Sequence, residues 1–249
     1  MTQHPLPADL GEGLTDLSPE DLRRRRAAVE RLLLAYRSGI DEVATKLRVL
    51  QREFRTTHDY NPIENYSTRL KSMPSLIIKA QKRGITSLTD LREQVTDIAG
   101  VRVVCSFTSD VYTVRDMLLA QDDLRLRREN DYIAAPKASG YRSVHLVVEV
   151  PVYLSSGVEQ VPVEIQLRTI AMDFWASLEH KIFYKYEGDV PARLADDLVS
   201  AAETSATLDR KMEGLHEEIA MLRSDDDSDP MTDELLRTLR MMTSELREP

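Results

Sequence analysis

The sequence is poor in several features that mark particular classes of protein. Its one cysteine, Cys105, excludes an intrachain disulfide, and its five histidines show none of the paired Cys/His spacing of a structural zinc site. No run approaches the ~18 apolar residues that cross a membrane, and the N-terminus lacks the cationic and apolar regions of a secretory leader. We therefore expect a cytoplasmic protein without a structural metal.

Positive charge is also in the minority, with 33 lysines and arginines against 42 acidic residues and a formal net charge of -9. An acidic net charge argues against an anionic ligand, but the acidic residues are not evenly distributed along the chain. Residues 186–249 carry 7 basic and 17 acidic side chains, whereas residues 61–185 carry 16 and 15. The middle of the chain therefore keeps enough cations to bind phosphates locally.

With 42% hydrophobic and 30% charged residues, the chain has the composition of an ordinary folded protein. Residues 1–17 are rich in Pro, Gly and Asp without periodicity, so we expect a mobile tail. Residues 18–60 read as N-terminal helices: Ser18 and Pro19 are a typical helix start, and Ser38-Gly39 separates the first helix from a second.

The spacing of apolar residues changes in residues 61–187, which we expect to form the central folded domain. Short β-rich runs at 101–107, 124–127, 143–150 and 161–168 alternate with helical patterns at 109–120 and 170–184. This order predicts an α/β, more closely α+β, fold: a mixed β-sheet flanked by N- and C-terminal helices.

Residues 188–249 carry helices of another kind. Apolar or small residues recur there with alternating spacings of four and three: Leu194, Leu198, Ala201, Ser205, Leu208, Met212, Leu215, Ile219 and Leu222. The pattern resumes at 235–246, after an acidic break. Such a narrow stripe is typical of coiled coils, so we expect self-association, with packing on the chain's own N-terminal helices as the alternative.

The alternation in the last strand separates two sets of side chains. Glu164, Gln166 and Arg168 face away from the apolar set that includes Val163 and Ile165, and His145 holds a similar outward position on the preceding strand. A face that combines an acid, an amide, an imidazole and guanidinium groups suits a magnesium nucleotide. A merely solvated antiparallel sheet face would show the same pattern.

Two segments upstream carry further candidates. Arg69, Lys71, Ser75 and Lys79 surround a helix start, where backbone N–H groups and cations suit a polyphosphate. Asp97 stands just before a strand, with Arg102 inside it. Asp97 is placed either to bind Mg²⁺, which proteins hold through one or two carboxylates plus substrate phosphates, or only to cap the turn.

The turn at 136–145 combines a cation, an aromatic ring and an imidazole. Tyr141 is placed to stack on a base, and Lys137, Arg142 and His145 are placed to meet phosphates.

Taken in order, these segments resemble the synthetase domain of the RelA/SpoT family, and the short chain resembles its single-domain small alarmone synthetases. The similarity spans roughly residues 60–187. It runs through R-x-K-x-x-x-S at 69–75, D-I-A-G-V-R at 97–102, D-Y-I-A-A-P-K-A-S-G-Y-R-S-V-H at 131–145 and E-I-Q-L-R-T at 164–169. The resemblance implies a nucleotidyltransferase-like core that transfers pyrophosphate from ATP to the 3′-hydroxyl of GDP or GTP. The products are (p)ppGpp, the alarmone of the stringent response, and AMP; no hydrolase activity is expected.

The resemblance also implies roles for individual residues. Arg69 and Arg102 would clasp the adenine of ATP, and its phosphates would be held by Lys71, Ser75 and Lys79. Asp97 and Glu164 would be the catalytic carboxylates and bind Mg²⁺. The acceptor GDP or GTP would be held by Tyr141, stacked on guanine, and by Lys137, His145, Gln166 and Arg168.

Two positions depart from the family pattern. Ser139 stands where Asn is usual, and Asn130 stands where a basic residue is usual. Both are on the acceptor side, so the preference among GDP, GTP and GMP is open. The resemblance further implies a homotetramer, and regulatory RNA or (p)ppGpp are candidate partners that the sequence does not decide.

Two other functions compete with this one. A catalytically impaired nucleotide-sensing or RNA-binding oligomer would share the fold, and a different nucleotidyltransferase would release pyrophosphate instead of AMP. The presence of both Asp97 and Glu164, together with Tyr141 and His145, favours the enzyme, because a binding module does not need two metal carboxylates.

Overall fold

The computed structural model of the chain describes residues 18–183 and 191–224. The tail expected at 1–17 and the second helical stripe at 235–246 lie outside these residues. Among the described helices, none is both long and apolar enough to cross a membrane.

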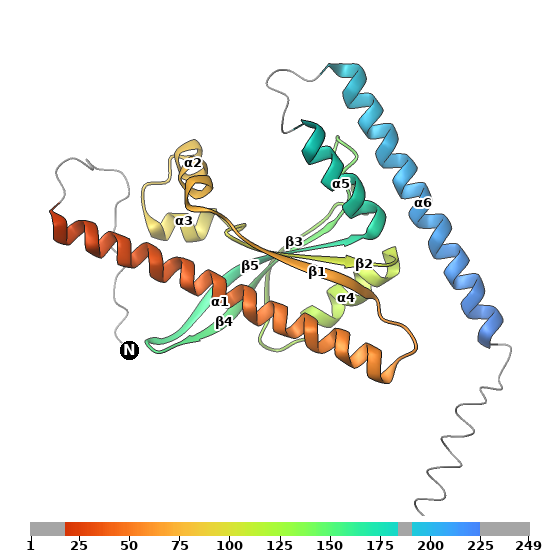
Figure 1. The fold of residues 1–249 in the computed structure, drawn as a ribbon, viewed down its shortest axis with the longest axis horizontal. Coiled ribbons are helices and arrows are strands. Elements are labelled where there is room, and N and C mark those ends of the chain that lie inside the picture. Colours follow the sequence, from red (N-terminus) through yellow and green to blue (C-terminus); the bar gives the residue numbers. More distant parts are fainter. Residues whose placement is uncertain (1–17, 184–190, 225–249) are drawn as a thin grey trace, which may run out of the picture. The chain divides into compact units, whose positions relative to one another are not determined.

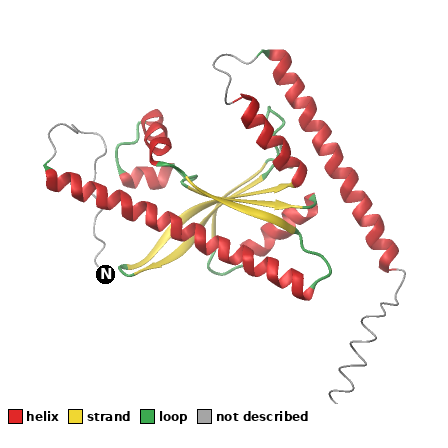
Figure 2. Cartoon of the chain, in the orientation of Figure 1, coloured by secondary structure: helices red, strands yellow, loops and turns green. Residues whose placement is uncertain are grey.

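A five-stranded mixed sheet forms the centre of the fold (Figure 1). The strands are β1 (Ile63–Leu70), β2 (Ala99–Cys105), β3 (Arg125–Asp131), β4 (Val144–Leu154) and β5 (Gly157–Thr169). Their order across the sheet is β1-β2-β5-β4-β3, and only β2 and β5 run parallel. The expected mixed sheet with flanking helices is confirmed, as the strands and helices in Figure 2 show.

The N-terminal segment is one helix, α1 (Pro19–Thr57), so the expected break at Ser38-Gly39 is wrong. Gly39 is a point of close packing instead of a helix end. A Cβ placed there would lie 3.0 Å from Val161 Cγ1 and 3.2 Å from Val163 Cγ2. Glycine at this position therefore lets the helix backbone approach β5, while the Ser18 side chain caps the helix start as expected by accepting from Asp21 N.

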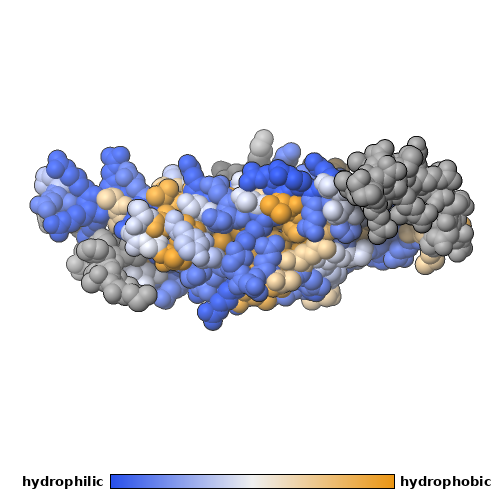
Figure 3. Space-filling model, turned by 90° about the horizontal axis from the view of Figure 1, so that it is seen from below, coloured by the Kyte–Doolittle hydropathy of each residue, from blue (hydrophilic) through white to orange (hydrophobic). Residues whose placement is uncertain are grey.

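The hydrophobic core lies on one face of the sheet. The inward side chains of the strands pack there with buried residues of α1, α2 (Met73–Arg83), α3 (Leu88–Gln94) and α4 (Thr108–Leu119). On one outer face of the molecule, hydrophobic residues gather mainly in the middle, with hydrophilic residues around them (Figure 3). The opposite face of the sheet carries mainly polar side chains, with the buried Val104 and Val147 among them.

The edge strand β1 is not among the strands predicted from the sequence. In β1 only Ile63 is fully buried, and most of the other side chains are exposed, because β1 is an edge strand. The alternation of apolar and polar residues in β1 is therefore too weak to predict a strand from the sequence.

Two helices follow the sheet, α5 (Ile170–Phe183) and α6 (Ala192–Ser224). Residues of α6 up to Asp209 belong to the same compact unit as the sheet, and a second unit begins at Arg210.

Candidate active site

Two rows of side chains cross the polar face of the sheet, one strand after another. The strand register aligns Arg69, Gly100, Glu164, Val147 and Arg128 in one row. The next row holds Ser67, Arg102, Gln166, His145 and Asn130. The predicted outward set on β5 and β4 is thus confirmed, and Glu164 lies at the middle of the first row.

A pocket of about 330 Å³ opens over these rows. It is lined by Ser67, Arg69, Lys71, Asp97, Gly100, Val101, Arg102, Glu164 and Gln166. The space beside Glu164 is open because its neighbour on β2 is Gly100. A Cβ at Gly100 would have only one close neighbour, the Arg69 carbonyl oxygen at 3.7 Å, so the protein itself does not fill this position. The pocket brings both candidate carboxylates together with three of the candidate cations.

Asp97 is held by two lysines from different elements. It lies in the turn before β2, and the backbone bond from Lys71 N to Ile98 O, 2.8 Å, places the end of β1 beside that turn. Lys71 Nζ then donates to Asp97 Oδ2 at 2.6 Å, and Lys79 Nζ of α2 donates to Oδ1 at 2.5 Å. Burial acts to raise the pKa of Asp97, but the hydrogen bonds and charges of the two lysines prevail and hold it below its ordinary value.

The same arrangement lowers the pKa of Lys79. Burial is the main cause, and repulsion from Lys71 adds to it, while Asp97 acts in the opposite direction. Two ammonium groups therefore sit beside one carboxylate, an excess of positive charge that suits a polyphosphate.

Two serines stand at the start of α2. Ser72 occupies the N-cap position, and Pro74 lies in the first turn. Ser75 lies in that turn too, with its hydroxyl 2.9 Å from the Ser72 hydroxyl. Both hydroxyls therefore stand at the helix N-terminus, where unpaired N–H groups favour an anion.

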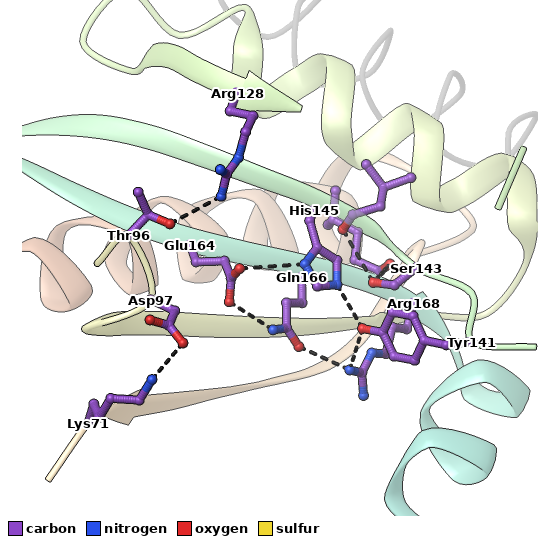
Figure 4. A network of polar contacts seen from close by, with 12 residues as sticks. Lys71, Thr96, Asp97, Arg128, Tyr141, Ser143, His145, Glu164, Gln166 and Arg168 are labelled. Carbon is purple, nitrogen blue, oxygen red and sulfur yellow. Dashed lines mark hydrogen bonds and ion pairs between the residues drawn. The ribbon is translucent and has the colours of Figure 1, made fainter. Parts of the chain in front are cut away.

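Glu164 belongs to a closed ring of polar contacts that five predicted residues form (Figure 4). Gln166 Nε2 donates to Glu164 Oε2 at 2.9 Å, and Arg168 Nη2 donates both to Gln166 Oε1 at 3.0 Å and to the Tyr141 hydroxyl at 2.7 Å. The Tyr141 hydroxyl lies 2.7 Å from His145 Nε2, and His145 Nδ1 lies 3.5 Å from Glu164 Oε1. Because Tyr141 accepts from Arg168, its own proton is free to point at Nε2, which leaves Nδ1 as the donor toward Glu164.

This network keeps Glu164 ionised. Its side chain is only 16% exposed, and burial acts to raise the pKa. Hydrogen bonds from His145 and Gln166 outweigh burial and the repulsion from Asp97, so the pKa of Glu164 lies below its ordinary value. Glu164 can therefore accept a proton or a cation at neutral pH.

Tyr141 lies at the centre of an aromatic and cationic cluster. Lys137 Nζ stands 4.7 Å from the centre of the Tyr141 ring and 4.5 Å from that of Tyr132, and Arg168 Cζ stands 5.2 Å from the Tyr141 ring. The ring of Trp175 is 6.4 Å away. Lys137, Tyr141, His145 and Arg168 therefore gather at one end of the polar face.

Three residues at the site, Asp173, Arg128 and Thr96, are not predicted from the sequence. Asp173, in the first turn of α5, pairs with both Arg102 and Arg168. Arg128 donates to the Thr96 hydroxyl at 3.1 Å, next to Asp97, although the two lie on distant segments (Figure 4). Only the position of Asp173 directly after the polar strand hints at its role, because a helix that begins there returns its first turn to the strand end.

Asp97 and Glu164 are the two side chains in the pocket that could offer hard oxygen ligands to a metal ion. Nowhere in residues 18–183 and 191–224 do three or more His, Cys, Asp or Glu side chains gather as a metal cage. A magnesium ion that is shared with substrate phosphates does not need such a cage, because one or two carboxylates suffice.

Comparison with known proteins points in one direction. Residues 68–189 match the family described as "Region found in RelA / SpoT proteins". The chain is 48% identical to GTP pyrophosphokinase YwaC of Bacillus subtilis (strain 168), over 75% of this chain and 90% of that protein.

Solved structures are similar as well. The small alarmone synthetase 1 from Bacillus subtilis bound to its product pppGpp has a TM-score of 0.71 and 39% identity, and the match covers 76% of this chain and 97% of that chain. The same enzyme bound to AMPCPP has a TM-score of 0.65 and 35% identity, with 77% and 97% covered.

Proposed function

Because this chain belongs to the RelA/SpoT family and is a small alarmone synthetase, we propose that it makes (p)ppGpp in the pocket between Asp97 and Glu164. The enzyme is a GTP pyrophosphokinase, which transfers pyrophosphate from ATP to the 3′-hydroxyl of GDP or GTP and releases AMP. The observation that carries the proposed location is the meeting of two carboxylates with Arg69, Lys71 and Arg102 in one pocket. Lys79 of α2 adds a further cation, because it donates to Asp97. Phosphoryl transfer needs this combination more than it needs a covalent nucleophile.

We assign ATP to the side of the pocket formed by β1, β2 and α2. Arg69 and Arg102 clasp the adenine, and Lys71, Ser75 and Lys79 hold the phosphates. This assignment is supported by Arg69, Lys71 and Arg102 lining one pocket and by the two lysines that converge on Asp97. When phosphates bind, the lysines can exchange a carboxylate partner for a phosphate one.

We assign GDP or GTP to the Tyr141 end of the polar face. Tyr141 stacks on guanine, and Lys137, His145, Gln166 and Arg168 position the nucleotide. The cluster of rings and cations around Tyr141 supports this assignment. Asn130 lies directly opposite His145 in the register, so its departure from the family pattern falls on the acceptor side, like that of Ser139.

Mg²⁺ fits the donor set, with Asp97 and Glu164 as its ligands. When bound, the ion neutralises charge on the phosphates of ATP. Glu164 accepts or orients the proton of the acceptor 3′-hydroxyl. The hydroxyl oxygen then attacks the β-phosphorus of ATP in line, the bond from that phosphorus to the oxygen bridging it to the α-phosphate breaks, and AMP leaves with that oxygen.

The assembly proposal concerns α6. Several stripe residues on that helix are exposed, among them Leu208, Met212 and Leu215. We propose that they join copies of the chain into a homo-oligomer, a tetramer by family resemblance, in the cytoplasm. Light scattering tests this: Leu208→Glu with Leu215→Glu should lower the molecular mass, and an unchanged mass would contradict it. Binding of regulatory RNA or (p)ppGpp stays a prediction.

One assay decides the central proposal. The purified protein is incubated with Mg²⁺, ATP labelled on its γ-phosphate, and GDP, GTP or GMP in turn. Label should move to a guanosine 3′-pyrophosphate while AMP accumulates. Release of pyrophosphate would indicate another nucleotidyltransferase, and no product with any acceptor would favour the nucleotide-sensing or RNA-binding alternative.

A further inference from the structure

The loop that carries Tyr141 is pressed against the first half of α6. Gly140 has a φ of +85°, and a Cβ built on it would lie 2.5 Å from the Ala202 Cβ and 3.6 Å from the Val199 Cα. The cavity that remains between the loop, α5 and α6 measures only about 10 Å³, too little to absorb a larger side chain. Glycine at one position and alanine at the other therefore set the distance between loop and helix.

Polar bonds fix the same helix to the end of β5 and to α5. Trp175 Nε1 donates to Leu198 O at 3.2 Å, and Ser205 Oγ donates to Ala171 O at 3.0 Å. Thr169 Oγ1 donates to Asp209 Oδ2 at 2.7 Å and accepts from Met172 N at 3.1 Å. Directional bonds of this kind fix the register of α6 as well as its proximity.

The face that α6 buries overlaps only in part with the stripe predicted for self-association: Leu198 and Ser205 of the stripe contact the rest of the unit. Ala202, Ala206 and Asp209 are at most 8% exposed, whereas Leu194 and Leu208 of the stripe are at least 40% exposed. Asp209 is a buried carboxylate in an otherwise small and apolar contact, and its bond to Thr169 specifies one arrangement of the helix. The first half of α6 therefore packs as part of the same compact unit as the sheet.

We propose that α6 is a positioning element of the acceptor site, acting through the contact of Ala202 with Gly140. It sets Tyr141 and Lys137 at the distance that the guanine needs, by holding the loop from behind. This inference rests on the proposed acceptor role of Tyr141. The element lies beyond the family match, which ends at residue 189, so acceptor binding in this chain depends on residues outside the shared synthetase region.

Ala202→Leu tests the contact directly. The added atoms must displace the Gly140 loop, so the KM for GDP or GTP should rise about tenfold, as expected for a small misplacement of a binding group, while the KM for ATP stays unchanged. Ala195→Leu on the same helix is the matched control, because Ala195 is exposed and lies outside the stripe; it should change neither constant.

Trp175 offers a readout that does not need turnover. It is the only tryptophan of the chain, and it touches both the loop cluster and α6. Titration of its fluorescence with GDP in the absence of ATP should give a dissociation constant that rises about tenfold in Ala202→Leu, in parallel with the KM. Thr169→Val, which removes the Asp209 bond while keeping the side-chain volume, should weaken GDP in the same direction even if Ala202→Leu fails to fold.

The outcomes separate two failures. If Tyr141→Ala leaves the acceptor KM unchanged, the acceptor assignment itself is wrong. If Tyr141→Ala raises it but folded Ala202→Leu and Thr169→Val do not, the helix does not position the loop. Equal increases for ATP and acceptor would indicate a general structural defect and would also overturn the inference.

Discussion

Arg102 of β2 and Arg168 of β5 are joined through one atom, Oδ1 of Asp173, which lies 3.2 Å from Arg102 Nη1 and 3.0 Å from Arg168 Nη1. Arg102 is assigned to ATP and Arg168 to the acceptor nucleotide. A single carboxylate from α5 therefore orients the guanidinium groups on both sides of the site.

Asp173→Asn should raise the KM for both substrates. The amide keeps the size and one acceptor oxygen but loses the charge, so we expect an effect of about fivefold on each constant, in line with the loss of a charge-assisted bond. Steady-state kinetics with each substrate varied in turn measure it. Asp116→Asn, which removes an ion-pair partner of Arg115 on α4, is the control and should change neither. An effect on one substrate alone would show that the two arginines are held independently.

Glu164→Gln and Asp97→Asn should each lower kcat by at least about 10²-fold, because each removes a carboxylate that handles the proton or the metal. Cooperative unfolding should be retained, since both side chains line a pocket and not the hydrophobic core. Glu149→Gln is the control. Glu149 lies on β4 and on the polar face of the sheet, but it pairs with Arg125 and Arg127 and does not line the pocket. Near-normal activity in both variants would refute the metal-pair assignment.

The lowered pKa values of Asp97 and Glu164 predict where stability depends on pH. A carboxyl whose pKa is lower in the folded chain stabilises the fold at pH values above its unfolded pKa, which is about 4. That contribution is lost as the pH falls through the folded pKa.

The difference in unfolding free energy between wild type and Asp97→Asn should therefore be flat at neutral pH and shrink below about pH 4. Denaturant titrations at a series of pH values measure it. A difference that already changes between pH 6 and 8 would contradict the assignment.

Gly39→Ala should destabilise the fold despite the better helix propensity of alanine. Overpacking against Val161 and Val163 costs about 1–3 kcal/mol, which exceeds the gain of about 1 kcal/mol from replacing a helical glycine. Denaturant unfolding measures the difference, and Asp41→Ala, an exposed change on the same helix, should stay within about 0.5 kcal/mol of wild type. A more stable Gly39→Ala would mean that β5 can move away from the helix.

The strands of the site could be predicted because their periodicity is local. Glu164, Gln166 and Arg168 alternate with buried residues, so two-residue spacing alone places them on one face. Two contacts at the site could not be predicted in this way: Asp173 pairs with Arg168 across a change from strand to helix, and Arg128 donates to Thr96 from the edge strand β3. Neither contact follows from the spacing of residues within one strand or helix.

In α6 the sequence pattern emphasises the wrong residues. The predicted stripe consists mainly of large apolar residues, whereas the residues of α6 that are buried against the rest of its unit are Ala202, Ala206 and Asp209. Small residues contribute little to hydrophobic periodicity. The packing role of Ala202 also depends on Gly140, which lies about sixty positions earlier in the chain. Gly39 was misread for a similar reason, because a glycine that permits close packing looks in sequence like one that ends a helix.

The parallel pairing of β2 with β5 also bears on how the enzyme acquires its activity. Gly100 aligns with Glu164 only after the chain between them has closed a long loop, and such distant contacts form slowly. A partly folded chain that contains every hairpin but lacks this one pairing has no catalytic site. During refolding from denaturant, recovered turnover should therefore lag behind helix formation and coincide with completion of the sheet.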